Sequence, residues 1–103
     1  MWTVDTMTYR VRPSTHKNKK WMVTLLSGRA IHFGDSEYED FTTHGDVKRR
    51  RNYIIRHASN EDWADPETAG FWSRWLLWEK NNIADAVADM RRRLAPASLE
   101  FRD

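Results

Sequence analysis

The sequence predicts an α+β domain in which a small antiparallel sheet packs against two to three short helices. A strand pair at residues 21–33 is followed along the chain by stretches of helical periodicity. Strands and helices that are segregated along a chain are typical of this fold class. With 103 residues the chain has room for one hydrophobic core. We therefore expect one compact domain over 20–94, an N-terminal strand or arm over 1–19 and a C-terminal tail over 95–103.

The N-terminal strand is predicted from alternation. Met7, Tyr9 and Val11 alternate with threonine and arginine until Pro13, and alternation with period two is typical of a half-buried strand. This segment is a possible third strand of the sheet. The same residues are also consistent with an arm that becomes ordered only on a partner.

The hairpin at residues 21–33 is predicted from its turn. Two β-prone runs flank Ser27-Gly28, which favours a two-residue turn with Gly28 at positive φ. In that register Val23 lies opposite His32. Both faces of the hairpin are then partly apolar, so helices are expected to cover at least one of them.

A basic helix is predicted over residues 47–57, with Asp46 as its N-cap. Helical periodicity collects an apolar stripe, which consists of Val47, Ile54, Ile55 and Ala58. The opposite face carries the candidate binding residues, which are Lys48, Arg49, Asn52 and Arg56. We expect this face to point towards solvent or a partner.

Two further helical segments follow. Residues 70–78 hold large apolar side chains at helical spacing, and we expect Phe71, Trp72 and Trp75 to be core residues, with Leu77 on the opposite side. Asn82 is the predicted N-cap of a last helix, whose core face consists of Ile83, Val87, Met90 and Leu94.

The charges form blocks of alternating sign. Residues 35–46 contain acids but no Lys or Arg, residues 47–58 contain Lys and Arg but no acid, and residues 59–67 are again acidic. Such blocks either pair within the fold or present separate patches to partners. The run Lys48–Arg51 is the strongest basic signal, and phosphate contacts require only such charge.

No pattern predicts catalysis. Cysteine is absent, which excludes disulfides and thiolate chemistry, and neither a phosphate-cradling glycine loop nor a Gly-x-Ser-x-Gly elbow is present. His32, His44 and His57 with the neighbouring aspartates allow a metal or acid–base site as a distant third interpretation, without a recognised ligand spacing. We expect no catalytic residue, no metal site and no cofactor.

One resemblance adds context. The strings that carry it are His32-Phe33-Gly34-Asp35, Tyr38-Glu39-Asp40-Phe41-Thr42, His44-Gly45-Asp46, Arg56-His57, Asn60-Glu61-Asp62-Trp63 and Thr68 to Trp78. Over roughly residues 20–80 the chain resembles a family of short, uncharacterised proteins encoded by large double-stranded DNA viruses of eukaryotes and by some phages. The resemblance implies a viral protein in the virion or in the interior of the infected cell. It implies no catalytic residues.

Two functions remain as hypotheses. The first is a non-enzymatic virion module, such as a minor capsid or cement protein, whose charge blocks contact viral capsid proteins. The alternative is a small viral DNA-binding protein that places the basic helix 47–57 on phosphates. No apolar run long enough to span a membrane is present, and the N-terminal residues lack the pattern of a secretory signal.

Overall fold

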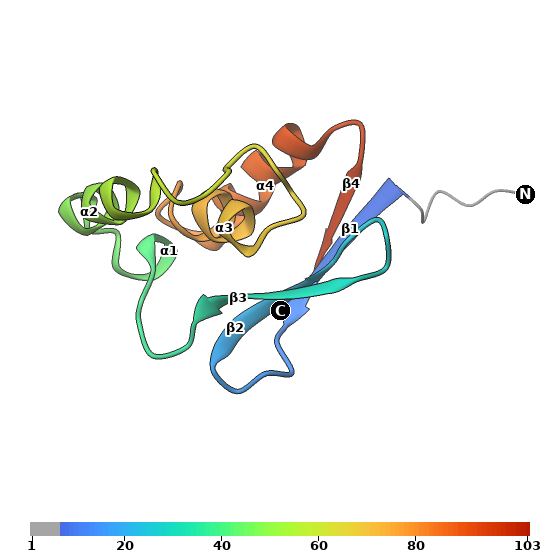
Figure 1. The fold of residues 1–103 in the computed structure, drawn as a ribbon, viewed down its shortest axis with the longest axis horizontal. Helices are drawn as coiled ribbons and strands as arrows, with labels where there is room; N and C mark the ends of the chain where they lie inside the picture. The colour runs from blue at the N-terminus through green and yellow to red at the C-terminus, as the bar shows by residue number, and fades with distance from the viewer. Residues whose placement is uncertain (1–6) are drawn as a thin grey trace, which may run out of the picture.

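The computed structural model describes residues 7–103 and confirms the α+β class. A four-stranded sheet lies on one side of the molecule and the helices on the other (Figure 1). The strands are β1 (Thr8–Pro13), β2 (Lys19–Thr24), β3 (Ala30–Asp35) and β4 (Ser98–Phe101). The helices are α1 (Phe41–His44), α2 (Val47–His57), α3 (Ala69–Trp72), the π-helical turn η2 (Ser73–Leu77) and α4 (Ile83–Leu94). None of the helices in this described part is long and apolar enough to cross a membrane.

β1 is the strand predicted within residues 1–19. Tyr9 and Val11 are buried, as the alternation predicted, and the strand ends at Pro13. Residues 1–6 of the predicted segment lie outside the described residues. β1 lies in the interior of the sheet, because the strand order is β3-β2-β1-β4.

The hairpin of β2 and β3 is confirmed, but its predicted register is wrong by one residue. Val23 lies opposite Ile31 rather than His32. The backbone N–H of Leu25 donates to the carbonyl of Arg29 at 2.8 Å, so the loop has three residues and not two. Gly28 takes the positive φ expected of it, 93°, at the position where a three-residue hairpin loop requires glycine.

The C-terminal segment contains the fourth strand. We predicted a tail over 95–103, and this is wrong for residues 98–101, which form β4. β4 runs parallel to β1, with Leu99 opposite Tyr9. The sheet is therefore mixed rather than purely antiparallel, and the buried Leu99 joins its core face.

The predicted aromatic helix forms the centre of the core as α3 and η2. Phe71 and Trp72 are buried as predicted, and Trp75 packs against the buried cluster. Leu77 is buried as well, although an α-helical wheel places it on the opposite side. The wider turn of η2 moves Leu77 towards β3, where its Cδ1 lies 2.9 Å from the position that a Cβ on Gly34 would occupy.

α4 closes the other side of the core. Asn82 Oδ1 accepts a hydrogen bond from the backbone N–H of Asp85 at 2.8 Å, which confirms the predicted N-cap. The predicted core face is buried at Val87, Met90 and Leu94. The helix packs against η2 and β4.

Candidate functional site

α2 begins at the predicted cap. Oδ1 of Asp46 accepts hydrogen bonds from the backbone N–H groups of Lys48 and Arg49, at 2.9 and 3.2 Å. The N–H of Asp46 in turn donates to Nδ1 of His44 at 2.8 Å. Gly45 has a φ of 65° and ends α1. These contacts fix the direction in which α2 leaves α1.

Replacement of Asp46 with alanine is expected to lower the free energy of unfolding by about 1 kcal/mol, the usual cost of losing an N-cap. Asp46→Asn keeps an oxygen that can accept both hydrogen bonds, so it is expected to cost only a fraction of that. Denaturant unfolding of both variants measures the difference. An asparagine variant as unstable as the alanine variant would contradict the capping role.

The inner side of α2 differs from the predicted apolar stripe. Val47 and Ile55, two members of that stripe, are 68% and 66% exposed, whereas Tyr53 is buried. The predicted stripe therefore does not mark the side of α2 that faces the core. The contacts that orient the helix are made by polar and aromatic side chains, which a hydrophobicity pattern does not record.

Arg50 and Tyr53 attach α2 to the segment after η2. Arg50 Nε donates to the carbonyl of Trp78 at 2.8 Å, and its Nη2 binds Oε1 of Glu79 at 2.7 Å. The Tyr53 ring stacks on Trp78 with centroids 4.3 Å apart and on His57 at the same distance. Because Arg50, Tyr53 and His57 face inward, the opposite side of α2 points outward.

The outward side of α2 carries the predicted candidate residues. Its exposed polar side chains are Lys48, Arg49, Asn52 and Arg56, joined by Arg51, and we refer to these five residues as the basic face. Within residues 7–103 no ion pair neutralises any of its four cations. The prediction that the four candidate residues point outward is confirmed.

The neighbouring acidic blocks find other partners. Their ion pairs are Lys20–Asp40, His57–Glu61 and Arg29–Glu67, at 2.7, 3.1 and 3.6 Å. Arg50 is the member of the basic run that is neutralised, and its partner Glu79 lies outside both blocks. Ion pairs with the two acidic blocks therefore do not neutralise the cations of the basic face.

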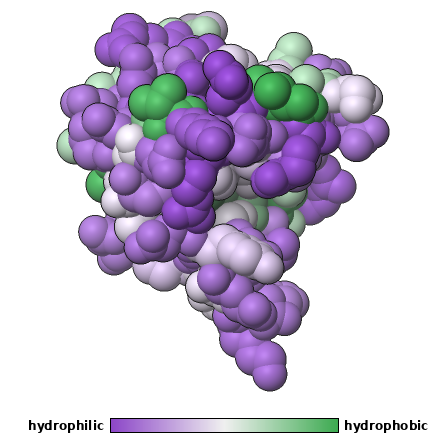
Figure 2. All heavy atoms as spheres, turned by 90° about the vertical axis from the view of Figure 1, so that its left-hand side faces the viewer, coloured by the Kyte–Doolittle hydropathy of each residue, from purple (hydrophilic) through white to green (hydrophobic). Residues whose placement is uncertain are grey.

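Apolar side chains accompany the cations on this end of the molecule. Val47 and Ile55 are exposed on α2. Figure 2 views the molecule from the side on which α2 lies and shows small apolar patches separated by hydrophilic surface. The surface around α2 is thus cationic with isolated apolar side chains, and it contains no broad apolar area in this view.

Glu79 attaches α2 to the segment that follows η2, through its ion pair with Arg50. Its Oε1 binds Arg50 at 2.7 Å and Arg74 at 2.8 Å. The buried Arg74 guanidinium also lies over the Trp75 ring, 4.2 Å from its centroid. Burial alone would raise the pKa of Glu79, but the hydrogen bonds and charges of Arg74 and Arg50 outweigh it and lower that pKa below its ordinary value.

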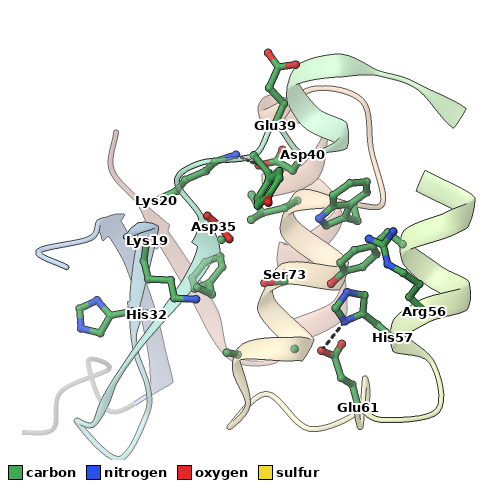
Figure 3. A pocket seen from close by; sticks show the side chains of 18 residues that line it. Lys19, Lys20, His32, Asp35, Glu39, Asp40, Arg56, His57, Glu61 and Ser73 are labelled. Atoms are coloured by element: carbon green, nitrogen blue, oxygen red, sulfur yellow. Dashed lines mark hydrogen bonds and ion pairs between the residues drawn. The ribbon is translucent and has the colours of Figure 1, made fainter. Parts of the chain in front are cut away.

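A cleft of about 370 Å³ lies between β3 and α2. In Figure 3 Lys19 and Asp35 lie on the sheet side, Arg56 and Glu61 on the α2 side, and Ser73 between them. Arg56 is a candidate residue predicted from the sequence, whereas the other four residues carry no sequence signal that connects them with it. They come from separate elements, so no local spacing indicates that they meet.

The histidines and aspartates do not converge. His32 and His57 line the cleft, whereas His44 is not part of its lining. Nδ1 of His32 lies 2.7 Å from Oγ of Ser14, and Nδ1 of His57 lies 3.1 Å from Oε2 of Glu61. No group of three His, Asp or Glu side chains within residues 7–103 has an arrangement that could hold a metal ion.

Comparison with known proteins gives one match. Residues 9–57, slightly less than half of the chain, are similar to a family described as a family of unknown function (DUF5754). The matched segment includes β1 except for Thr8, together with β2, β3, α1 and α2, and therefore the whole basic face. No curated protein and no solved structure matches the chain.

Proposed function

We propose that this chain is a non-enzymatic nucleic-acid-binding module that places the basic face of α2 on phosphates. The observation that supports this most directly is the set of four exposed cations on one helix, none of them paired within the described residues. The phosphates of a nucleic acid can neutralise these four cations. Binding then releases the counterions that the nucleic acid had condensed. A virion or an infected cell is the setting that the viral resemblance supports.

The dimensions of α2 suit a groove of duplex DNA. Its 11 residues span about 16 Å, and an α-helix fits the major groove, which is about 12 Å wide. Asn52 lies on the outward side, among the cations, and an asparagine amide can make two hydrogen bonds to adenine. Phosphate contacts by Lys48, Arg49 and Arg56 would position the helix without selecting a sequence.

A virion structural module, of the minor capsid or cement type, is the second candidate. The observation that favours it is the exposure of Val47 and Ile55 beside the cations. Phosphates offer no apolar contact, whereas an acidic capsid surface with apolar side chains would satisfy both kinds of residue. This candidate also involves no catalysis, and it uses the same end of the molecule.

Neutralisation of the basic face distinguishes the two candidates. We expect the triple variant Lys48→Gln, Arg49→Gln and Arg56→Gln to bind duplex DNA more weakly for every sequence tested. Its slope of log K against log salt concentration is expected to be smaller by about three units, close to one per phosphate contact. The measurement is fluorescence anisotropy with a labelled duplex across a salt series.

A matched control carries the same loss of charge elsewhere. Lys17→Gln, Arg29→Gln and Arg102→Gln also remove three exposed cations, none of them on α2, and this variant is expected to retain most of the wild-type slope. Equal losses in both triple variants would contradict a specific role of the basic face. If wild-type protein does not bind duplex DNA at low salt, the nucleic-acid proposal is wrong and the capsid-surface candidate takes its place.

A further inference from the structure

The cleft between β3 and α2 has charged groups left over after its internal pairs are formed. Lys20 Nζ binds Asp40 at 2.7 Å, and His57 binds Glu61 at 3.1 Å. Glu39 contributes to the lining, but Figure 3 shows its carboxylate pointing away from the other labelled side chains. The other charged groups that line the cleft include Lys19, Asp35 and Arg56.

Two cations and one carboxylate remain. Lys19 extends from β2 towards the helix that carries Ser73, and Asp35 lies on the same side of the cleft (Figure 3). Arg56 lies on the opposite, α2 side. Within the described residues neither Lys19 nor Arg56 forms an ion pair. The cleft therefore has one unpaired cation on each side, Lys19 and Arg56, and the carboxylate of Asp35 lies on the same side as Lys19. The two cations could bind an anion between them.

Neutral hydrogen-bonding groups line the cleft between these charges. Ser73 and Tyr53, which both carry hydroxyl groups, belong to the lining residues. Burial raises the pKa of the Tyr53 hydroxyl, and the charge of Glu61 adds to the effect. The hydroxyl is therefore protonated at neutral pH and can donate a hydrogen bond to an anionic ligand.

An exposed aromatic ring completes the cleft. Tyr38 is part of the lining and is 67% exposed, unlike Tyr53, whose faces are covered by His57 and Trp78. An exposed ring presents a face on which a nucleobase can stack. A volume of about 370 Å³ is at the lower end of the range for small-ligand sites, roughly 300–1,000 Å³.

We propose that this cleft binds one nucleoside monophosphate unit, with its phosphate between Lys19 and Arg56, its sugar hydroxyls donating to Asp35 and its base against Tyr38. The inference extends the proposed function, because Arg56 belongs both to the basic face and to the cleft. A nucleic-acid strand bound along α2 can then insert an unpaired or terminal nucleotide into the cleft. A free nucleotide carries the same chemistry and is the other source of the unit.

Chemical-shift mapping of isotope-labelled protein tests the proposal, with adenosine monophosphate, adenosine and inorganic phosphate as separate probes. We expect saturable binding of the nucleotide, with the largest backbone shifts at β3, residues 38–40 and residues 70–73. Binding of adenosine or phosphate alone should be at least about tenfold weaker, because each lacks one class of contact. Nucleotide-induced shifts confined to the outward side of α2, or no saturation, would overturn the proposal.

Variants outside α2 keep this test separate from that of the proposed function. Lys19→Gln is expected to weaken nucleotide binding about tenfold, as for the loss of one charge-assisted hydrogen bond, and to leave duplex binding unchanged. Lys17→Gln, an exposed lysine outside the cleft lining, is the matched control. Tyr38→Ala should weaken adenosine monophosphate binding but not phosphate binding. Equal affinities in Lys19→Gln and Lys17→Gln would overturn the assignment of the phosphate position.

The source of the nucleotide is resolved by comparing strands. If the unit comes from a strand, a single-stranded oligonucleotide will compete with adenosine monophosphate for the cleft, and Lys19→Gln will weaken the binding of both. If it is a free nucleotide, the oligonucleotide will bind without displacing it. Duplex binding without nucleotide binding leaves the proposed function standing and overturns the inference. Nucleotide binding without duplex binding supports a ligand site here and contradicts the proposed function.

Discussion

Replacement of Trp72 with alanine is expected to lower the free energy of unfolding by about 3–5 kcal/mol, in the range for deletion of a buried aromatic side chain. Trp72 is 0% exposed. Its ring lies 5.4 Å from the ring of Tyr9 and 6.1 Å from that of Phe33, so it connects the helical layer to β1 and β3. Domains of this kind have total stabilities of about 5–15 kcal/mol, and the variant is expected to be partly unfolded at physiological temperature.

Two controls separate packing from hydrogen bonding. Trp72→Phe keeps a ring but removes the hydrogen bond from Nε1 to the carbonyl of Pro66, which measures 2.8 Å, and is expected to be less destabilising than alanine. Tyr38→Ala removes an aromatic side chain that is 67% exposed and is expected to change stability by less than about 0.5 kcal/mol. If Trp72→Ala unfolds at the same denaturant concentration as wild type, the ring is not part of the core.

Replacement of Glu79 with alanine is expected to cost about 3–5 kcal/mol, because it leaves buried positive charge without its partner. Arg74 is the group affected most, since it is 7% exposed and binds Glu79 at 2.8 Å. Arg50 loses its ion pair as well, which loosens α2. The exposed pair of Arg29 and Glu67 provides the control, and Glu67→Ala is expected to cost less than about 1 kcal/mol.

The same carboxylate makes stability depend on pH. The pKa of Glu79 is lower in the folded protein than in the unfolded chain, because Arg74 and Arg50 favour its charged form. Its contribution is therefore complete above the unfolded pKa of about 4.3 and is lost as the pH falls through the lower folded value. Asp89, whose pKa Arg93 and other cations lower against the effect of burial, acts in the same direction. Unfolding curves between pH 7 and pH 3 should show a smaller loss for Glu79→Gln than for wild type.

The features that the sequence predicted correctly depend on short-range signals. The cap residues Asp46 and Asn82 act on backbone groups within the next three residues, so their effect can be inferred without the rest of the fold. Alternation at Tyr9 and Val11 and the glycine at the hairpin turn are equally local. The outward direction of Lys48, Arg49, Asn52 and Arg56 follows from the solvation of charged side chains.

The features that it did not predict depend on contacts between distant segments. β4 has four residues, and its place in the sheet follows from pairing with β1. The inner side of α2 is chosen by Trp78 and Glu79, whose positions depend on the π-helical turn. The cleft brings Lys19 and Arg56 together from β2 and α2. The spacing of residues within β2 or within α2 does not predict that the two segments meet.

The pairing of β1 with β4 has a consequence for the order in which the protein can fold during translation. The segment that resembles the family of unknown function, residues 9–57, contains three strands and α2 but lacks α3, η2, α4 and β4. While a ribosome is still synthesising residues 58–101, the emerged hairpin has neither the aromatic cover for its apolar face nor the neighbour for the open edge of β1. Contacts between such distant residues slow folding, so the nascent chain exposes a sheet edge to chaperones or to other chains until β4 emerges.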